Sequence, residues 1–151
     1  MLDRAARVTG DGLAIALREI DGLIPYAKNA RTHSAEQVAL IAGSIREFGF
    51  VNPVLVDGAN GVIAGHGRLL AARKLGLDRV PVIELGHLSE AQKRALILAD
   101  NRLAERAGWD REMLALEAAD LEALGVDLAT LGFEAAEIDG KRPLITLCLV
   151  A

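Results

Sequence analysis

The sequence predicts a small α/β domain in which a mixed sheet packs against helices, followed by a helical C-terminal appendage. Three observations support this class. Short runs of strand composition alternate with segments whose apolar residues recur at helical spacing. Two Ser-x-x-Gln sequences mark helix starts. Residues 61–76 run from a strand through a glycine-bracketed turn into a helix, which makes this stretch the centre of the predicted fold.

The chain divides into four segments. We expect a flexible arm over residues 1–12, one folded domain over 13–108, the helical appendage over 109–140 and an apolar tail over 141–151. The tail has strand-like composition and needs a core or an interface to cover it. Alternatively, it marks the place where a longer parent chain has been cut or altered.

Composition limits the classes of function. The net charge is −4 and the pI is near 5.4, so any contact with nucleic acid must be local. Aromatic residues make up only 3%, which predicts a core of Ala, Leu, Ile and Val. A single cysteine, Cys148, excludes an internal disulfide and a CxxC redox pair, and favours the cytoplasm. We expect no membrane partner, because the sequence shows neither a signal peptide nor a long apolar span.

The first predicted elements are a strand over residues 13–20 and an extended loop over 23–33. The loop contains a proline and several polar or basic side chains at short spacing, namely Lys28, Asn29, Arg31 and His33. Loops of this kind carry binding residues or serve as solvated connections, and the segment alone does not decide between them.

A helix begins after Ser34, because Ser34 and Gln37 can each accept a hydrogen bond from the other's backbone amide. Gly49 marks the residue just beyond its end. Its apolar face is predicted from helical spacing and comprises Val38, Ile41, Ile45 and Phe48.

Two short strands, 54–56 and 62–64, are joined by a hairpin loop rich in turn residues. The helix after Gly65 ends at Gly76, with its inward residues predicted as Leu69, Leu70, Ala72 and Leu75. A further strand over 80–84 contains Pro81, which limits that strand to an edge or places the proline at an end.

Two more helices complete the prediction. A second capping box at Ser89 and Gln92 starts a helix that runs to about Ala104, and Asp110 caps another helix over 111–124. The burial face of the latter is predicted as Leu114, Ala118, Leu121 and Leu124. The first of these helices presents an acid, an amide and a guanidinium side by side in 100–102, which suits a metal-bound phosphate or a plain solvated helix end.

The turn Gly65-His66-Gly67-Arg68 is a candidate phosphate cradle. Its glycines permit positive φ and close approach of a ligand, and the first amides of the helix favour an anion. The Arg68 guanidinium matches a phosphate or carboxylate. The alternative is a tight turn in which Arg68 only caps or pairs. His66 is either a general base, a phosphate donor or a turn residue.

Three sequence boxes occur in an order that resembles the N-terminal domain of the ParB/sulfiredoxin superfamily, over about residues 15–110. The first runs from Ile24-Pro25 to Arg31, with Ala30 in place of a proline. The second, residues 65–71, is similar to the GERRxRA phosphate-binding box but lacks the doubled arginine. The third is the Ala99-Asp100-Asn101-Arg102 sequence.

The resemblance implies a site for CTP or ATP with Mg²⁺. Its nucleotide-binding residues would be Asn29, Arg31, Gly65, His66, Gly67, Arg68, Asp100 and Asn101. Asp100 and Asn101 would also lie near the metal, and His66 and Asp100 are the catalytic candidates. DNA and a second copy of the chain, as a homodimer, are the implied partners. A DNA-facing strip would include Arg73, Lys74, Arg79 and Arg102, unless these residues form an ordinary solvated face.

Residues 49–110 are also similar to the ParB-like domain found ahead of phage and bacterial DNA methyltransferase modules. The implied role is an accessory module of a DNA-modification or phage system, since no methyltransferase motif is present. The alternatives are a small-molecule kinase of the superfamily, whose Gly-His-His-Arg turn resembles GHGR, and a ParB-like nuclease. Clustered carboxylates would favour a nuclease, and the candidates are Asp57, Glu84 and Asp100.

Overall fold

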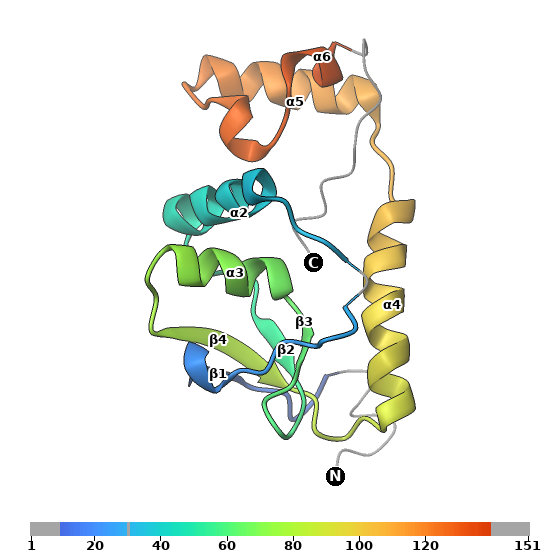
Figure 1. The fold of residues 1–151 in the computed structure, drawn as a ribbon. Coiled ribbons are helices and arrows are strands. Elements are labelled where there is room, and N and C mark those ends of the chain that lie inside the picture. The colour runs from blue at the N-terminus through green and yellow to red at the C-terminus, as the bar shows by residue number, and fades with distance from the viewer. Residues whose placement is uncertain (1–9, 30, 140–151) are drawn as a thin grey trace.

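The computed structural model describes residues 10–29 and 31–139, and its centre is a four-stranded mixed sheet (Figure 1). The strands are β1 (Ile15–Glu19), β2 (Val54–Val56), β3 (Val62–Ala64) and β4 (Arg79–Glu84), in the spatial order β1-β4-β2-β3. β4 pairs antiparallel with β1 and parallel with β2, and β2 pairs antiparallel with β3. The predicted mixed sheet and the hairpin are confirmed.

Helices cover the sheet from two sides (Figure 1). Helices α2 (Ala35–Phe48) and α3 (His66–Lys74) lie over one face, and α4 (Glu90–Arg106) runs alongside β3. A short 3-10 turn, η1 (Ile20–Gly22), follows β1. The appendage consists of α5 (Arg111–Ala123), η2 (Leu128–Leu131) and α6 (Ala135–Ile138), and it contacts α2 through η2.

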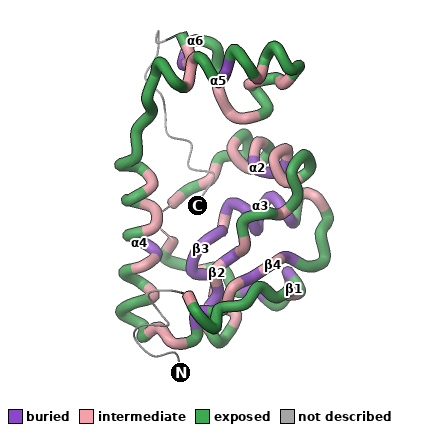
Figure 2. The backbone as a smooth tube through the Cα atoms, turned by 180° about the vertical axis from the view of Figure 1, so that it is seen from behind, coloured by how far each residue is buried: buried purple, intermediate pink, exposed green. Residues whose placement is uncertain are grey.

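The core is aliphatic, as composition predicts. The side chains of Val54, Val56, Val80 and Val82 are at most 1% exposed and form one cluster with Leu69 and Ala72 of α3. Ile41 and Ala42 of α2 pack against Ala71 in a second cluster, and Ile63, Leu85 and Ile97 attach α4 in a third. Figure 2 shows the buried residues concentrated in β2, β3, β4 and α3, whereas β1 is largely exposed.

Three residues predicted to be buried are exposed, namely Phe48, Leu70 and Leu124. Helix α3 lies between the sheet and α2, so Leu69 and Ala72 contact the sheet while Ala71 contacts α2. Leu70 therefore points away from both layers. Phe48 and Leu124 stand at helix ends, beyond the neighbouring elements that cover the middle of each helix.

The two predicted capping boxes differ in the structure. At Ser89 both reciprocal bonds with Gln92 form. At Ser34 the side chain accepts from the Gln37 amide, but the Gln37 side chain bonds His33 instead of the Ser34 backbone. The second half of that box is therefore wrong, because His33 lies within reach of the same amide group. Gly49 ends α2 with φ of 87°, as predicted.

Strand β4 lies inside the sheet, so the edge placement considered for it is wrong. Pro81 is the third of the six residues of β4 and pairs with Leu17 of β1, so it does not lie at an end of the strand either. It is tolerated because the ladder with β2 begins only at Val82.

Some predictions fall on residues outside the described part of the chain. These are residues 1–9 of the predicted arm, which was expected over 1–12, and the apolar tail over 141–151 with Cys148. No helix among residues 10–29 and 31–139 is long and apolar enough to cross a bilayer.

Candidate functional site

A small pocket lies where the first loop, the start of α3 and the middle of α4 meet. It is lined by Asn29, Arg31, His33, Ile63, Ala64, Gly65, His66, Asp100 and Asn101. Six of the eight predicted nucleotide-binding residues are in this lining, although they come from three regions far apart in the sequence. The structure thus brings the three sequence boxes to one place.

The turn into α3 requires glycine at its first position. Gly65 has φ of 102°, and a Cβ there would lie 3.0 Å from Arg68 Nη2 and 3.2 Å from Val54 Cγ2. The Leu69 amide makes the first bond of the helix, to the Gly65 carbonyl at 2.9 Å. The amides of the three residues before Leu69 have no partner within the helix by position, so the helix start presents donors and a partial positive charge.

His66 is held in one orientation by the first loop. Its Nε2 accepts a hydrogen bond from the Tyr26 amide at 3.2 Å, so the ring hydrogen of the neutral form lies on Nδ1. Burial lowers the pKa of His66, and the positive charge of His33 lowers it further. His66 is therefore a neutral ring at physiological pH, with a donor at Nδ1.

Arg68 points into the protein. Its side chain is 5% exposed and its Nη2 donates to the Pro53 carbonyl at 2.9 Å. Burial lowers the pKa of Arg68, while the charge of Asp100 acts in the opposite direction. Gly67 and Arg68 are the two predicted ligands that do not line the pocket. The guanidinium instead braces the turn against the residue that precedes β2.

Other polar residues of the pocket form ion pairs or hydrogen bonds with neighbouring protein groups. Arg31 Nη1 pairs with Glu105 Oε1 at 3.1 Å, and Asn29 Oδ1 accepts from the Arg31 amide at 3.2 Å. Asn101 Nδ2 donates to the Ile97 carbonyl of its own helix at 2.8 Å. A ligand that binds Arg31 must therefore compete with Glu105.

Two residues of the site were not among the predicted ligands, His33 and Glu105. His33 was noted only as one polar residue of the first loop, and nothing in the spacing connects it with the glycine turn. Glu105 lies 74 residues from Arg31, so only the packing of α4 beside the loop reveals the pair.

The four predicted DNA-binding residues are exposed but not gathered on one strip. Arg73 and Lys74 occupy the last turn of α3, at the end of that helix away from α4, and Arg79 begins β4 (Figure 1). Arg102 lies on α4 and pairs with Glu105 at 3.1 Å. Their role towards DNA stays a prediction.

The candidate carboxylates are separated. Asp57 pairs with Lys93 at 2.8 Å, Glu84 pairs with Arg18, and Asp100 faces the pocket. Within the described part of the chain, no group of three or more His, Cys, Asp or Glu side chains is placed to hold a metal ion. Asp100 and Asn101 fit Mg²⁺ in the mode where one or two protein ligands share the ion with substrate phosphates.

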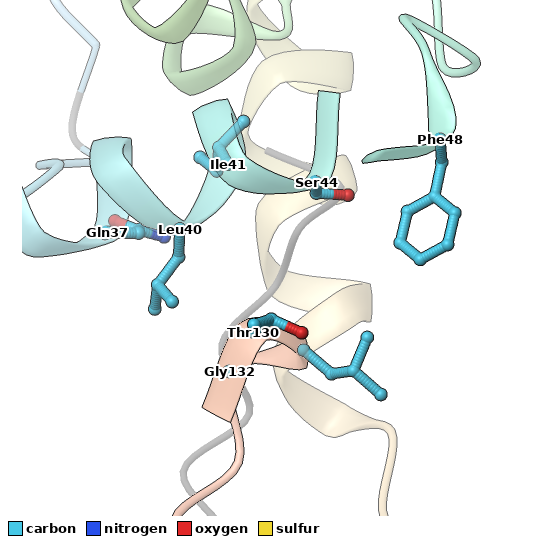
Figure 3. Close-up of a pocket in the computed structure, with 8 residues that line it drawn as sticks. Gln37, Leu40, Ile41, Ser44, Phe48, Thr130 and Gly132 are labelled. Carbon is cyan, nitrogen blue, oxygen red and sulfur yellow. The ribbon is translucent and has the colours of Figure 1, made fainter. Parts of the chain in front are cut away.

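A separate apolar pocket lies between α2 and η2. In Figure 3, Leu40 of α2 points towards the η2 segment with Thr130 and Gly132. Ile41 and Ser44 of the same helix also line this pocket. It contains none of the predicted site residues. It marks the contact between the domain and the appendage.

A mixed sheet with a glycine turn that opens into a helix, beside an acid and an amide on a neighbouring helix, defines a ParB-like domain. Residues 7–102 match the ParB N-terminal domain, and the chain belongs to that family. The ParB-like nuclease domain-containing protein YnaK of Escherichia coli (strain K12) is 54% identical over 82 residues, which cover 54% of this chain and 94% of the relative.

Solved structures agree with this assignment. The C-terminally truncated chromosome-partitioning protein ParB of Caulobacter crescentus, complexed with CTP-γ-S, has a TM-score of 0.65 and 25% identity over 85% of this chain and 72% of that chain. The same truncated protein complexed to the centromeric parS site has a TM-score of 0.50 and 21% identity, over 82% of this chain and 68% of that chain. The second likeness concerns the fold alone.

Proposed function

We propose that this domain binds a nucleoside triphosphate, CTP or ATP, with Mg²⁺ at the start of α3, and that it acts with DNA. One observation carries the proposal. The predicted ligands from three separate sequence boxes line a single pocket, with the positive end of a helix at one wall. The similar Caulobacter crescentus structure was solved with a CTP analogue, which supports a nucleotide as the ligand.

Each pocket residue has a role that its chemistry suits. The amide of His66 receives a phosphate oxygen, because His66 lines the pocket in the first turn of α3. Arg31 supplies a planar cation after it leaves Glu105. Asp100 and Asn101 hold Mg²⁺ together with the phosphates. Arg68 is a positioning residue, since it fixes the turn through the Pro53 carbonyl.

The geometry favours binding over phosphoryl transfer to a small hydroxyl. A kinase needs a general base near the acceptor, and the Nε2 atom of His66 already accepts the Tyr26 amide. Asp100 is the remaining candidate base. No cluster of carboxylates among the described residues supports a nuclease. Asp57 and Glu84 pair with separate cations, and Asp100 lines the proposed nucleotide pocket.

We further propose that the domain is an accessory module of a DNA-modification or phage system, with a DNA methyltransferase module as partner, a homodimeric assembly and a cytoplasmic location. The sequence resemblance to domains that precede methyltransferases supports this context. DNA as the other partner rests on the same resemblance, since the likeness to the parS-bound ParB concerns the fold alone. DNA would meet exposed basic residues such as Arg73 and Lys74, and this contact would weaken steeply with salt.

Isothermal titration of CTP, ATP and ADP with Mg²⁺ tests the nucleotide site. We expect wild-type protein to prefer one triphosphate, and Arg31→Ala and Asp100→Ala each to weaken binding at least about tenfold, the loss expected for a charge-assisted contact. Arg46→Ala, an exposed change on α2, should bind as wild type does.

Equal affinity in Asp100→Ala and wild type would contradict the proposed site. Absence of binding to every nucleotide would contradict the proposed function itself. Repeating the titration with duplex DNA separates the two classes of function, because a switch changes its nucleotide affinity with DNA, whereas a kinase consumes the triphosphate when a hydroxyl acceptor is added.

A further inference from the structure

His33 lies directly against the turn that begins α3. A Cβ built on Gly67 would stand 3.0 Å from His33 Cε1, 3.1 Å from His33 Nδ1 and 3.0 Å from Ile41 Cδ1. Real Cβ atoms are rarely so close to a neighbour. The His33 ring therefore packs where a side chain at position 67 would otherwise lie. The second glycine of GHGR is therefore explained by His33.

The hydrogen-bonding of His33 leaves one ring nitrogen for a ligand. Nδ1 bonds the Gln37 side chain at 3.1 Å, and with the amide oxygen as acceptor the ring hydrogen lies on Nδ1. Nε2 is buried and has no hydrogen-bond partner among the described residues, while the ring lines the pocket with His66. A buried polar atom without a partner is costly, which indicates that something polar binds there.

We propose that His33 binds a phosphate of the nucleotide through Nε2, as an imidazolium donor, in the space that Gly67 leaves open. This inference rests on the proposed nucleotide site. GHGR has glycine where the GERRxRA box has its first arginine, so the turn itself carries no cation at that position. His33 supplies a cation from the first loop, in the lining of the same pocket.

The charges around His33 couple this contact to protons. His66 on α3 faces His33 closely enough for the charge of one to oppose that of the other. Arg31 on the same loop and Asp100 on α4 line the same pocket, and the neutral Gln37 on α2 bonds the ring. A bound phosphate favours the protonated form of the His33 ring, because an anion within about 4–6 Å stabilises its positive charge. Nucleotide binding therefore takes up a proton, and affinity falls as pH rises through roughly 6 to 8.

The test is nucleotide affinity measured from pH 6 to 8.5 for wild type and His33→Asn, whose amide nitrogen can keep the bond to Gln37. His87→Asn is the matched control, since His87 lies outside the pocket lining. We expect His33→Asn to bind at least about fivefold more weakly at pH 6 and to converge with wild type by pH 8.5, whereas His87→Asn follows wild type. Unfolding curves establish that the variant is folded.

A direct readout is the NMR signal of the His33 ring, with and without the nucleotide. We expect saturation with nucleotide to shift the signals around His33 Nε2 and to leave those of the His87 ring unchanged. If wild type binds nucleotide while His33→Asn shows the same affinity and the same pH slope, this inference fails and the proposed function stands. If wild type binds no nucleotide at any pH, both fail.

Discussion

Glu105 holds the cation that a nucleotide would need. Its Oε1 pairs with Arg31 and its Oε2 pairs with Arg102, each at 3.1 Å. The Arg31 side chain is 16% exposed and that of Glu105 is 46% exposed, so the pair is partly screened by solvent and each link is weak. The acid therefore competes with phosphates for Arg31 but does not prevent their binding.

Glu105→Gln should strengthen nucleotide binding, because Arg31 is then free of a competing carboxylate. A partly exposed pair contributes about 0.2–1 kcal/mol, so the dissociation constant should fall by roughly 1.5- to 5-fold in titration calorimetry. Glu90→Gln is the control, since Glu90 pairs with Lys93 at the other end of α4. Unchanged or weaker binding in Glu105→Gln would show that Arg31 does not meet the ligand.

Gly67→Ala should destabilise the fold by about 1–3 kcal/mol, because the added methyl group overlaps with His33 and Ile41. In a His33→Ala background the loss should be smaller, since half of the overlap is removed. Chemical denaturation of the two single variants and the double variant measures this coupling.

Gly43→Ala on α2 gives the matched comparison, because a Cβ there meets nothing within 4 Å. That change should be neutral or stabilising, by up to about 1 kcal/mol. Additive losses for Gly67→Ala and His33→Ala would show that His33 is not what requires a glycine at this position.

At the residue scale, sequence chemistry predicted the members of the pocket better than their orientations. The glycines, the acid and the amide are identifiable because each belongs to a short box with a specific chemistry. Arg68 turns inward and Arg31 pairs with Glu105, and neither follows from local spacing, because both depend on which distant element packs beside the turn.

At the element scale, the β2–β3 hairpin is joined to α4 by one acidic residue. Asp57 Oδ1 accepts from the amides of Ala59 and Gly61, both at 2.8 Å, and Oδ2 pairs with Lys93. The bond to Lys93 is the main cause that lowers the pKa of Asp57, and the two backbone bonds act in the same direction against burial. This carboxylate positions the strand that leads into the glycine turn.

Asp57→Asn should lower stability at neutral pH by about 1 kcal/mol, since the charged contact with Lys93 is lost while the turn can still be capped. The folded pKa of Asp57 lies below its usual value of 3.8, so its contribution is complete above that value. The contribution is lost as pH falls through the folded pKa.

Urea unfolding at pH 7 and at pH 3 measures this dependence. The gap between wild type and Asp57→Asn should be largest at pH 7 and should shrink at pH 3. A gap that stays constant with pH would mean that the charge of Asp57 does not stabilise the fold.

Element prediction succeeded where the signal is local. The capping residue Ser89 and the hairpin loop each act within a few positions of the chain, and both form as predicted. Strand order is a property of the whole sheet, so Pro81 alone could not show that β4 is internal. Burial of Leu70 failed for the same reason, because helical spacing does not reveal which layers lie above and below α3.

At the scale of the whole molecule, the segment of α5, η2 and α6 contacts the ParB-like fold through η2. They meet where η2 packs on α2 beside the apolar pocket of Figure 3, and Trp109 stacks edge-on against Phe133 within the appendage, with ring centroids 5.4 Å apart. The nucleotide pocket involves none of these contacts.

The global class of the protein was predictable because the three boxes keep their order along the chain. The arrangement of the basic residues predicted to contact DNA was not predictable, since Arg79 and Arg102 lie on elements whose relative position only the fold determines (Figure 1). The sequence predicts that the appendage is helical. It does not predict that η2 packs on α2, because an apolar surface does not identify the surface that covers it.

The most direct test of the central claim is to map amide chemical-shift changes by NMR as Mg²⁺ and CTP, or Mg²⁺ and ATP, are added to the full chain. We predict that the largest changes fall on the first turn of α3, at His66 and Gly67, and on Asp100 and Asn101 of α4. Arg31→Ala should diminish all of them together. Changes centred on the α2–η2 pocket, or no changes with either nucleotide, would contradict a nucleotide site at the start of α3.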